Sequence, residues 1–483
     1  MKYITTKISV CAFALFLTFS STAQNYLVDW DYLGRKTVAE MFLIFFQQVD
    51  HDVDLYKLTY NTTGIDNLPD TASGLAAIPV VPEESLLPIV VFQHGTTSGP
   101  TDVPSMLRGG YEAPMGYAGM GFITFAADFL GLGDSRGFHP YLHAATEASA
   151  ALDMLNAGLE FLELYPENKP QWNPNFLFVS GYSQGGHASM ALHREIDKFW
   201  SFVYPVTAAT HMSGPYDLSG TMRNLILADV DYQDPAYIAY IALGLQAVYG
   251  NLYTSIDEVF KEPYAAAIDS FANRFTTLGT LNGRLLHELG KTGNLYTWRM
   301  FQDDFLDAFT NDPEHPFQLA LEENDVYQWA PEAPTRLYYC SGDEQVPYQN
   351  SLVAVAAMNA LGAPDVVAED FGALLNHSLC VLPSALSSIS FFRSFLESSS
   401  TLSPTTHPEI LSVYPNPAME EIYVLWENAL EGMDWKLYTI TGQLVDAGKG
   451  SDNRIILGDL ESGMYVLTVT ADGETRTGRF VKL

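Results

Sequence analysis

The sequence around Ser183 has the pattern of a nucleophile elbow, Gly181-Tyr-Ser183-Gln-Gly185. An apolar run, residues 176–180, precedes it, and residues 188–200 follow with apolar side chains at helical spacing. A strand, a tight turn and a helix in this order expose a serine hydroxyl as a nucleophile. Gly181 and Gly185 suit such a turn because a side chain at either position would collide with the neighbouring backbone. The alternative interpretation is a chance glycine-rich turn.

An acid and a histidine stand downstream, each just past a strand-like run. The order Ser183, Asp343, His377 predicts a Ser-His-Asp triad with Ser183 as nucleophile, His377 as general base and Asp343 as the group that orients the imidazole. Glu344 is the competing acid, and Asp343 is favoured because Val346-Pro347 follows it at the usual offset. Taken separately, Asp343 could be a turn former and His377 a surface residue.

The residues after another apolar run, 87–92, could stabilise an oxyanion. This run ends in Gln93-His-Gly-Thr-Thr97. We expect the backbone N–H groups of Thr96 and Gln184 to form the oxyanion hole, with Thr97 as the second choice in the first loop. His94 could instead be a packed polar residue at a strand end.

The elements that would position these residues alternate between strand and helix. This alternation predicts an α/β fold with a mostly parallel sheet and helices on both faces. Residues 53–60 alternate between polar and apolar, which is typical of an antiparallel edge strand. Asp128 and Asp134, after the strand-like run 121–127, could be catalytic carboxylates, but turn capping explains them better.

From about residue 221 to 329 the alternation stops and the chain becomes helical and aromatic. An insertion of this size after a sheet strand predicts a cap over the active site. Residues 232–253 are apolar around most of a helix, so we expect them to face either the sheet or a hydrophobic acyl group. An ordinary helical subdomain with an aromatic core is the alternative.

The N-terminus and the composition indicate export. Residues 1–23 have the pattern of a signal peptide: a basic start, an apolar run and small residues at the end. Cys11 lies inside the apolar run and not at the cleavage point, so a lipoprotein anchor is not indicated. No later stretch is long enough for a transmembrane anchor. The formal net charge of −33 argues against nucleic acid as a partner and disfavours tight binding to anionic membranes and charged substrates.

Two cysteines remain after the signal peptide, Cys340 and Cys380. They lie three residues from the proposed acid and three from the proposed base, so a disulfide could join the two loops, and two free buried thiols are the alternative. No Cys/His cluster has the spacing of a metal site.

With these motifs together, residues 75–397 resemble a secreted serine α/β-hydrolase of the secretory lipase group. The resemblance lies in Gln93-His-Gly-Thr-Thr97, Asp128-Phe-Leu-Gly-Leu-Gly-Asp134, Gly181-Tyr-Ser-Gln-Gly-Gly186, Gly214-Pro-Tyr-Asp217 and Gly342-Asp-Glu-Gln-Val-Pro347. It implies a catalytic domain over residues 24–397 that hydrolyses carboxylic esters, small or lipid-like, without a cofactor. A serine peptidase on the same fold and a non-catalytic binding protein are the competing functions.

A polar Ser/Thr/Pro linker, residues 398–408, leads to a C-terminal region, residues 409–483, with the short strands and turns of a small β-sandwich. Val413-Tyr-Pro-Asn-Pro417, Thr441-Gly-Gln-Leu-Val445 and Leu460-Glu-Ser-Gly-Met-Tyr-Val-Leu467 resemble the sorting domain of type IX secretion cargo. This implies a Bacteroidetes-like bacterium, the secretion machinery as partner, and a secreted or cell-surface protein from which the domain is commonly removed. A carbohydrate-binding β module is the alternative.

Overall fold

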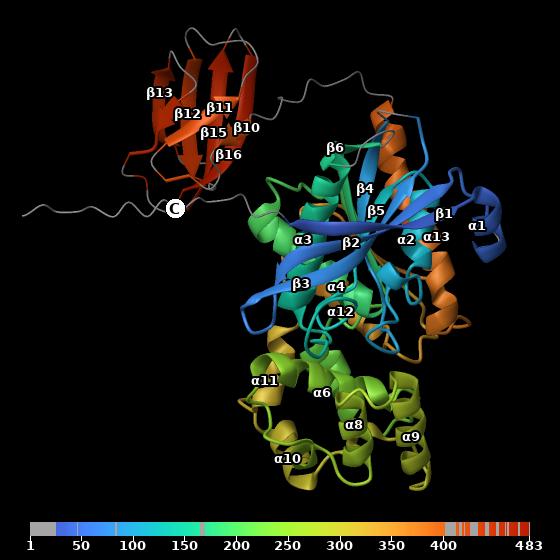
Figure 1. Ribbon diagram of the computed structural model, residues 1–483. Helices are drawn as coiled ribbons and strands as arrows, with labels where there is room; N and C mark the ends of the chain where they lie inside the picture. Colours follow the sequence, from blue (N-terminus) through green and yellow to red (C-terminus); the bar gives the residue numbers. More distant parts are fainter. Residues whose placement is uncertain are drawn as a thin grey trace, which may run out of the picture. The chain divides into compact units, whose positions relative to one another are not determined.

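The computed structural model describes most of the chain (Figure 1). The described residues are 26–45, 47–82, 85–164, 170–400, 412–414, 418–419, 421–425, 433–439, 444–450, 454–458, 460, 463–471 and 474–482. The expected signal peptide, residues 1–23, lies outside them, as do residues 401–408 of the expected linker. The chain divides into two compact units, and the larger one is Asn25–Glu397.

One sheet forms the centre of the larger unit. Its strands are β1 (Leu27–Lys36), β2 (Val53–Thr63), β3 (Pro69–Pro79), β4 (Leu86–Gln93), β5 (Ile123–Ala127), β6 (Gln171–Tyr182), β7 (Ala208–Met212), β8 (Thr335–Tyr339) and β9 (Val366–Asp370). The spatial order is β1-β2-β3-β5-β4-β6-β7-β8-β9, with antiparallel pairing from β1 to β5 and parallel pairing from β5 to β9. The predicted α/β class with a mostly parallel sheet is confirmed.

The first two strands differ from the sequence prediction. Residues 53–60 do form an antiparallel strand, but β1 pairs outside β2 and takes the edge of the sheet. Nearly every residue of β2 is therefore buried or half-buried, including its polar positions such as Asp54, which bonds Arg35 of β1 at 2.8 Å. The alternation of residues 53–60 could not show that another strand covers the edge.

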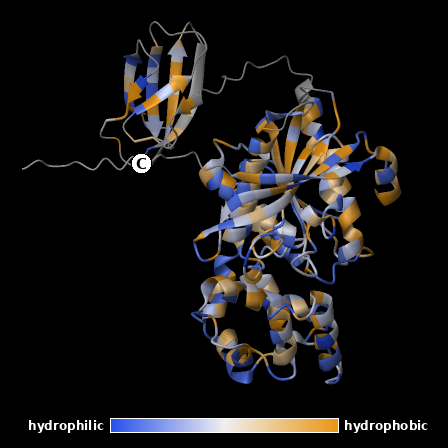
Figure 2. Ribbon diagram, in the orientation of Figure 1, coloured by the Kyte–Doolittle hydropathy of each residue, from blue (hydrophilic) through white to orange (hydrophobic). Residues whose placement is uncertain are grey.

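Helices cover both faces of the sheet. They are α1 (Val38–Phe45), α2 (Glu112–Gly119), α3 (Ala144–Leu164), α4 (Gln184–Glu195), α12 (Gln349–Ala360) and α13 (His377–Ser400), with short turns η1 (Pro104–Met106) and η2 (Ile196–Trp200). Buried residues of α3 and α4 share one apolar cluster with the strands, and those of α2 and α13 share another. The central strands are mainly hydrophobic (Figure 2), as expected of parallel strands buried on both faces.

The chain between β7 and β8 is helical, as the sequence predicts. Its elements are η3 (Leu218–Met222), α5 (Arg223–Leu227), α6 (Pro235–Tyr249), α7 (Ile256–Val259), α8 (Tyr264–Ala272), α9 (Leu278–Gly290), η4 (Thr297–Met300), α10 (Asp303–Asn311) and α11 (Pro316–Glu323). We call this segment the cap. Ten of the fifteen residues of α6 are buried, and the hydrophobic ones belong to a core shared with the other cap helices.

The C-terminal strands form two antiparallel sheets. One contains β10 (Ser412–Tyr414), β11 (Glu421–Leu425) and β14 (Arg454–Ile456), and the other contains β12 (Met433–Thr439), β13 (Leu444–Gly450), β15 (Gly463–Ala471) and β16 (Glu474–Lys482). Their apolar residues, including Val424, Leu437 and Leu467, form one buried cluster. The small C-terminal β domain of the predicted fold class is confirmed.

Helix α13 continues to Ser400, so the first three residues of the expected linker are helical. Among the described helices, it is the one whose length and apolar composition would allow it to cross a membrane, so the expectation that no later stretch is long enough was wrong on length. In this fold, however, Cys380, Ile389 and Phe392 of α13 pack into the apolar cluster beneath the sheet. Part of the apolar surface of α13 therefore belongs to the core of the larger unit, while Leu379 and Leu382 remain exposed.

A disulfide joins Cys340 to Cys380, with Cα atoms 6.0 Å apart. Cys340 directly follows β8 and Cys380 lies in the first turn of α13, and both are fully buried. Of the two alternatives left open by the sequence, the structure has the bonded one. The bond closes a segment of 40 residues and ties together the loops that carry Asp343 and His377.

The turn between β6 and α4 is closely packed. A Cβ atom on Gly181 would lie 2.0 Å from the Gly185 carbonyl oxygen, and one on Gly185 would lie 1.9 Å from the Gln93 carbonyl oxygen. Between these glycines, Ser183 has a φ of 61°, a region that non-glycine residues rarely adopt. Both positions therefore have no room for a side chain, as the sequence predicts. The turn holds Ser183 in a strained conformation.

We expect Gly185→Ala to prevent this turn from forming, because backbone atoms of β4 cannot move away from the added methyl group. The free energy of unfolding should fall by about 3 kcal/mol or more. Gly279→Ala is the matched control: its Cβ would meet nothing within 4 Å in helix α9, so it should be neutral or stabilise by about 0.5–1 kcal/mol. Urea unfolding measures both, and equal stability of the two variants would contradict the packing.

Removing the disulfide with Cys340→Ser and Cys380→Ser together should lower stability by about 4 kcal/mol in the chain-entropy model for a loop of this length. Mass spectrometry without reductant checks the bond, and thermal unfolding with and without reductant checks its contribution. Two free thiols in the exported protein would contradict the observed link.

Candidate active site

The segments that follow four parallel strands of the sheet build the candidate site. Thr96 follows β4, Ser183 follows β6, Asp343 follows β8, and His377 follows β9 as the first residue of α13. Carboxyl ends of parallel strands meet at one edge of the sheet, so residues distant in sequence come together there.

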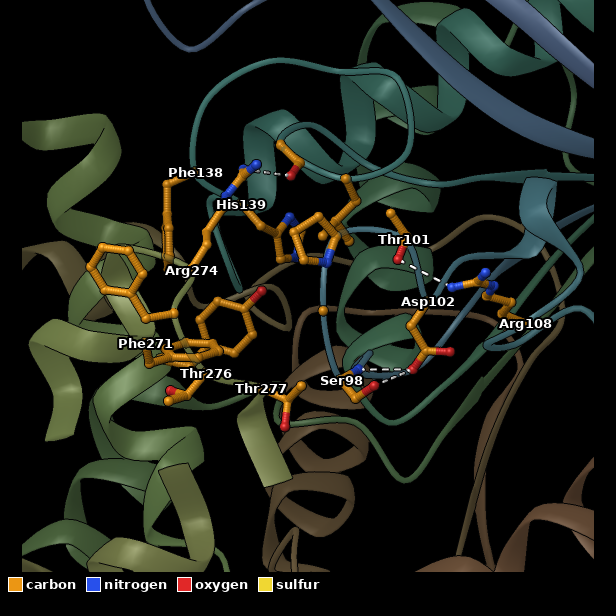
Figure 3. A pocket seen from close by; sticks show the side chains of 16 residues that line it. Ser98, Thr101, Asp102, Arg108, Phe138, His139, Phe271, Arg274, Thr276 and Thr277 are labelled. Carbon is orange, nitrogen blue, oxygen red and sulfur yellow. Dashed lines mark hydrogen bonds between the residues drawn. The ribbon is translucent and has the colours of Figure 1, made fainter. Parts of the chain in front are cut away.

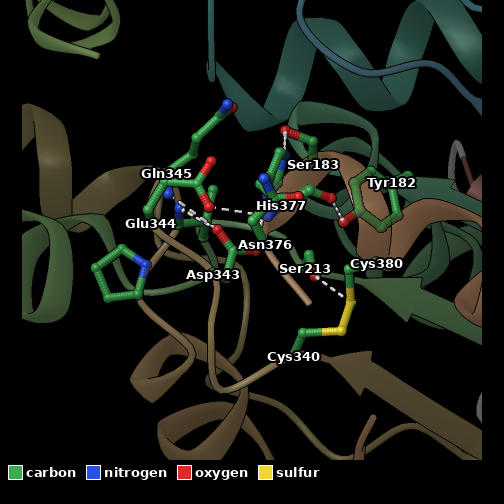
Figure 4. A network of polar contacts seen from close by, with 12 residues as sticks. Tyr182, Ser183, Ser213, Cys340, Asp343, Glu344, Gln345, Asn376, His377 and Cys380 are labelled. Atoms are coloured by element: carbon green, nitrogen blue, oxygen red, sulfur yellow. Dashed lines mark hydrogen bonds and ion pairs between the residues drawn. A yellow bond between two sulfur atoms is a disulfide. The ribbon is translucent and has the colours of Figure 1, made fainter. Parts of the chain in front are cut away.

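The three residues predicted for a triad form one hydrogen-bonded chain (Figure 4). His377 Nε2 lies 2.9 Å from Ser183 Oγ, and His377 Nδ1 lies 2.7 Å from Asp343 Oδ2. If Nδ1 donates its hydrogen to the carboxylate, the lone pair of Nε2 faces the serine hydroxyl. The Asp343 and His377 side chains are 1% and 7% exposed, so little water competes for these bonds.

The two neighbouring acids have different partners. The other Asp343 oxygen, Oδ1, accepts the backbone N–H groups of Gln345 and Val346 at 3.0 and 2.9 Å. Glu344, the competing acid in the sequence, accepts the backbone N–H of His377 at 3.0 Å and does not contact the imidazole. Both carboxylates thus bind the histidine segment, and only that of Asp343 reaches the ring.

A tyrosine that the sequence analysis did not single out fixes the histidine from the other side. The Tyr182 hydroxyl donates to the His377 carbonyl oxygen at 2.6 Å, and the two rings lie 5.1 Å apart. Tyr182 is the last residue of β6 and directly precedes the candidate nucleophile. The end of this strand therefore carries Ser183 and also forms a hydrogen bond with His377. Its place inside the elbow motif was the available signal.

The predicted oxyanion residues flank Ser183. Gly95 lies so close that its added Cβ would be 3.5 Å from Ser183 Cβ, which brings the β4 loop against the serine. Among the hydrogen bonds of the described residues, the backbone N–H groups of Thr96 and Gln184 have no acceptor. His94 is buried, and its ring nitrogens lie 2.8 and 3.2 Å from the carbonyl oxygens of Gly95 and Asp128, which agrees with a packed polar residue that supports this loop.

The side chains of Thr96 and Gln184 have hydrogen-bond partners in other segments of the chain. Thr96 Oγ1 lies 2.7 Å from the Tyr141 hydroxyl, and the Tyr141 ring stacks on Tyr240 of α6 at 4.3 Å. The Gln184 amide donates to Glu147 Oε1 at 2.9 Å and lies 2.8 Å from His139 Nε2. The sequence alone did not identify these partners. Glu147 could have been noticed, because it is an acid on the alanine-rich buried face of α3.

Other polar residues have structural roles. Asp128 is buried and accepts hydrogen bonds from Ser73 and Ser105, and Asp134 pairs with Lys57. Neither contacts the Ser183 group, which agrees with the interpretation as loop-stabilising residues. Within the part of the chain that the structure describes, no three His, Cys, Asp or Glu side chains are grouped to hold a metal ion.

The cap contacts the acid loop. The hydroxyls of Tyr232 and Tyr237 donate to the carbonyl and side-chain oxygens of Gln345 at 2.9 and 3.2 Å. Asp234, between them, lies near the site: burial raises the pKa of its carboxyl, and the charge of Glu344 raises it further. The segment before α6 therefore adds negative charge beside His377.

Solved structures with a similar fold include several ester hydrolases. The esterase LipA of Xanthomonas oryzae, which degrades rice cell walls, is 27% identical with a TM-score of 0.64, covering 79% of this chain and 99% of the esterase. A putative hydrolase from Legionella pneumophila is 25% identical with a TM-score of 0.70, covering 78% of this chain and 100% of its own. Lipase A of Candida antarctica, at 15% identity and a TM-score of 0.57, covers 79% of this chain and 84% of the lipase, and shares the fold.

Residues 412–483 match the family model of the secretion system C-terminal sorting domain. A comparison with curated proteins gave no significant match. The comparisons support an ester hydrolase at the family level. The chain thus has an α/β-hydrolase fold, its structural neighbours include esterases and a lipase, and its C-terminal residues match a secretion sorting domain.

Proposed function

We propose that this protein is a secreted serine carboxylic-ester hydrolase that acts on hydrophobic acyl esters through Ser183, His377 and Asp343. The observation that carries the proposal is the chain of two contacts, 2.9 Å from Ser183 Oγ to His377 Nε2 and 2.7 Å from His377 Nδ1 to Asp343 Oδ2. These distances fit a base that takes a proton from a serine hydroxyl and an acid that orients the base.

In the proposed reaction, Ser183 Oγ attacks the ester carbonyl while His377 Nε2 takes its proton. The N–H groups of Thr96 and Gln184 bind the oxyanion, and Asp343 stabilises the imidazolium. The C–O bond to the alcohol then breaks, and His377 gives the proton to the leaving alcohol. Water, deprotonated by His377, hydrolyses the acyl-enzyme and releases the acid, and no cofactor takes part.

A cavity of about 430 Å³, which has the size of a small-ligand site, is lined by the loop after β4 and by residues of the cap, and Ser183 and His377 are not among its lining residues (Figure 3). It includes Ser98, two residues after Thr96, and His139, whose ring contacts the Gln184 side chain. Four of its sixteen lining residues are aromatic, namely Phe138, Tyr240, Phe271 and Phe275, and Asp102, Arg108 and Arg274 add charge to the lining. The aromatic rings support a substrate with a hydrophobic group.

The cap is proposed to roof the site. Its contacts to Gln345 and, through Tyr240 and Tyr141, to Thr96 support this role. The apolar residues of α6 mostly pack inside the cap, so Tyr240 and the α8–α9 segment are the better candidates for substrate contact. Asp234 and Glu344 beside His377 should repel anionic substrates.

The sorting domain points to secretion or attachment at the cell surface. An extracellular site agrees with the buried disulfide, because disulfides persist in oxidising compartments. We propose that the C-terminal region engages the secretion machinery, that the protein has no transmembrane anchor and no nucleic-acid partner, and that residues 1–23 are removed on export.

Changes to the three proposed catalytic residues should lower p-nitrophenyl ester hydrolysis and leave folding intact. Ser183→Ala and His377→Ala should each reduce kcat by about 10⁴-fold or more, and Asp343→Asn by about 10³- to 10⁴-fold, because the imidazole loses its orientation. Glu344→Gln is the matched control. It keeps an acceptor for the His377 N–H and should stay within about threefold.

Circular dichroism would verify folding of each variant, and a fluorophosphonate probe would test labelling of Ser183. Undiminished hydrolysis by the His377 variant would remove this residue from the mechanism. Faster cleavage of peptide amides than of matched esters would favour the peptidase alternative.

Acyl-chain length should affect the rate if a hydrophobic group binds the aromatic cavity. Because each buried methylene contributes at most about 0.8 kcal/mol, kcat/KM should rise from acetyl to octanoyl esters. Phe271→Ser should flatten this rise relative to Phe199→Ser, an exposed phenylalanine that does not line the cavity. A flat or falling profile for the unmodified protein would contradict the hydrophobic site, whereas the triad would be unaffected.

A further inference from the structure

A buried carboxylate that the proposed mechanism does not use lies next to the nucleophile helix. Glu147 of α3 is 1% exposed. Its Oε1 accepts the Gln184 side-chain amide at 2.9 Å, and its Oε2 lies 2.6 Å from His187 Nδ1. Removing a carboxylate from water is costly unless its oxygens are paired, and here both are.

The hydrogen positions in this group follow from its outer partners. His139 Nδ1 faces the Leu130 carbonyl at 2.8 Å, and a carbonyl only accepts, so Nδ1 carries the hydrogen and Nε2 can accept from Gln184. Burial, which lowers the pKa of His139 to about 4, keeps this ring neutral near pH 7. Both amide hydrogens of Gln184 thus have acceptors, one on His139 and one on Glu147.

The same group extends to the cap. His187 Nε2 faces the Asn324 carbonyl oxygen at 2.9 Å, so it also carries a hydrogen. Asn324 lies just after α11, and its side-chain amide donates to Tyr249 of α6 at 3.0 Å. One line of buried hydrogen bonds therefore connects the cap, α3 and the first turn of α4.

Gln184 occupies a sensitive position. It directly follows Ser183, whose φ of 61° is strained, and it is the first residue of α4. A strained turn keeps its conformation only where its surroundings leave no alternative. A side chain held at both amide hydrogens limits the rotation of the backbone to which it is attached, and the N–H of that backbone is the proposed oxyanion donor.

We propose that Glu147 is a positioning residue for ester hydrolysis: by accepting the Gln184 side-chain amide, it aims the Gln184 backbone N–H at the oxyanion. This inference rests on the proposed function. Glu147 should stabilise the transition state, which carries the negative oxygen, and should have little effect on the affinity for the uncharged ester.

Three variants test the hydrogen bond. Glu147→Met removes the acceptor and should lower kcat by about 10- to 100-fold, with KM within about threefold, because a displaced donor loses most of its contribution. Glu147→Gln can accept from Gln184 and donate to His187 Nδ1, so it should recover activity to within about fivefold of the unmodified protein. Asp153→Leu is the control: Asp153 is a half-buried acid of the same helix that accepts from Thr62.

Binding of a trifluoromethyl ketone separates positioning from folding. This probe forms a tetrahedral adduct with Ser183 Oγ that carries an oxyanion, so its affinity should fall in Glu147→Met by the same factor as kcat. The non-fluorinated methyl ketone should bind Glu147→Met and the unmodified protein with equal affinity. The Asp153 variant should lower the melting temperature without changing kcat per folded molecule.

A second route covers the case in which Glu147→Met does not fold. Gln184→Met removes the same hydrogen bond from the other side and leaves the Glu147–His187 contact in place. It should show the same loss of kcat, and adding Glu147→Gln should then change kcat no further.

Unchanged kcat and ketone affinity in folded Glu147→Met or Gln184→Met would overturn the positioning role, as would a Glu147→Gln variant as slow as Glu147→Met. These outcomes are distinct from failure of the proposed function. In that case Ser183→Ala would retain ester hydrolysis, whatever the Glu147 variants do.

Discussion

The close approach of backbones around Ser183 is the constraint on which the rest of the candidate site depends. Gly185 lies against the Gln93 carbonyl and Gly181 against that of Gly185, so the nucleophile turn and the end of β4 fit only in the absence of side chains. This packing holds Ser183 at a positive φ and brings the Thr96 loop beside it. The strain is sustained by the buried strands on both sides, since β4 and β6 are central in the sheet.

The other side of the site is held by a different kind of link. The acid lies in the loop after β8 and the histidine begins α13, and the Cys340–Cys380 disulfide joins these two segments. Tyr182 and Glu344 then bind the backbone carbonyl and N–H of His377. The imidazole is thus oriented by covalent, backbone and side-chain contacts together, which leaves Asp343 free to bond the ring itself. Such redundancy suits the proposed role of His377 as a general base, because proton transfer needs a closely fixed imidazole.

The cap is attached to the sheet unit by polar and aromatic contacts at the same edge. Its own hydrophobic residues pack mainly with one another, so its core is largely separate from those of the sheet. Tyr141 stacks on Tyr240, Gln345 accepts from two cap tyrosines, and His187 bonds the Asn324 carbonyl. The loops around Ser183 therefore share partners with the cap, and substitutions on either side should affect the other.

The sequence by itself determined the features that local rules control: the glycine turn at Ser183, the alternation of strand and helix, the helical insertion, the C-terminal strands, and the order of serine, acid and histidine. Side-chain periodicity and turn sterics act over a few residues, so they can be read without partners. The tertiary structure decided the contacts between distant segments. These include the pairing of β1 with β2, the bonded cysteines, and the contact of Glu147 with the Gln184 side chain. Such contacts depend on strand order and register, which place residues dozens or hundreds of positions apart within hydrogen-bond distance, and no local pattern encodes that geometry.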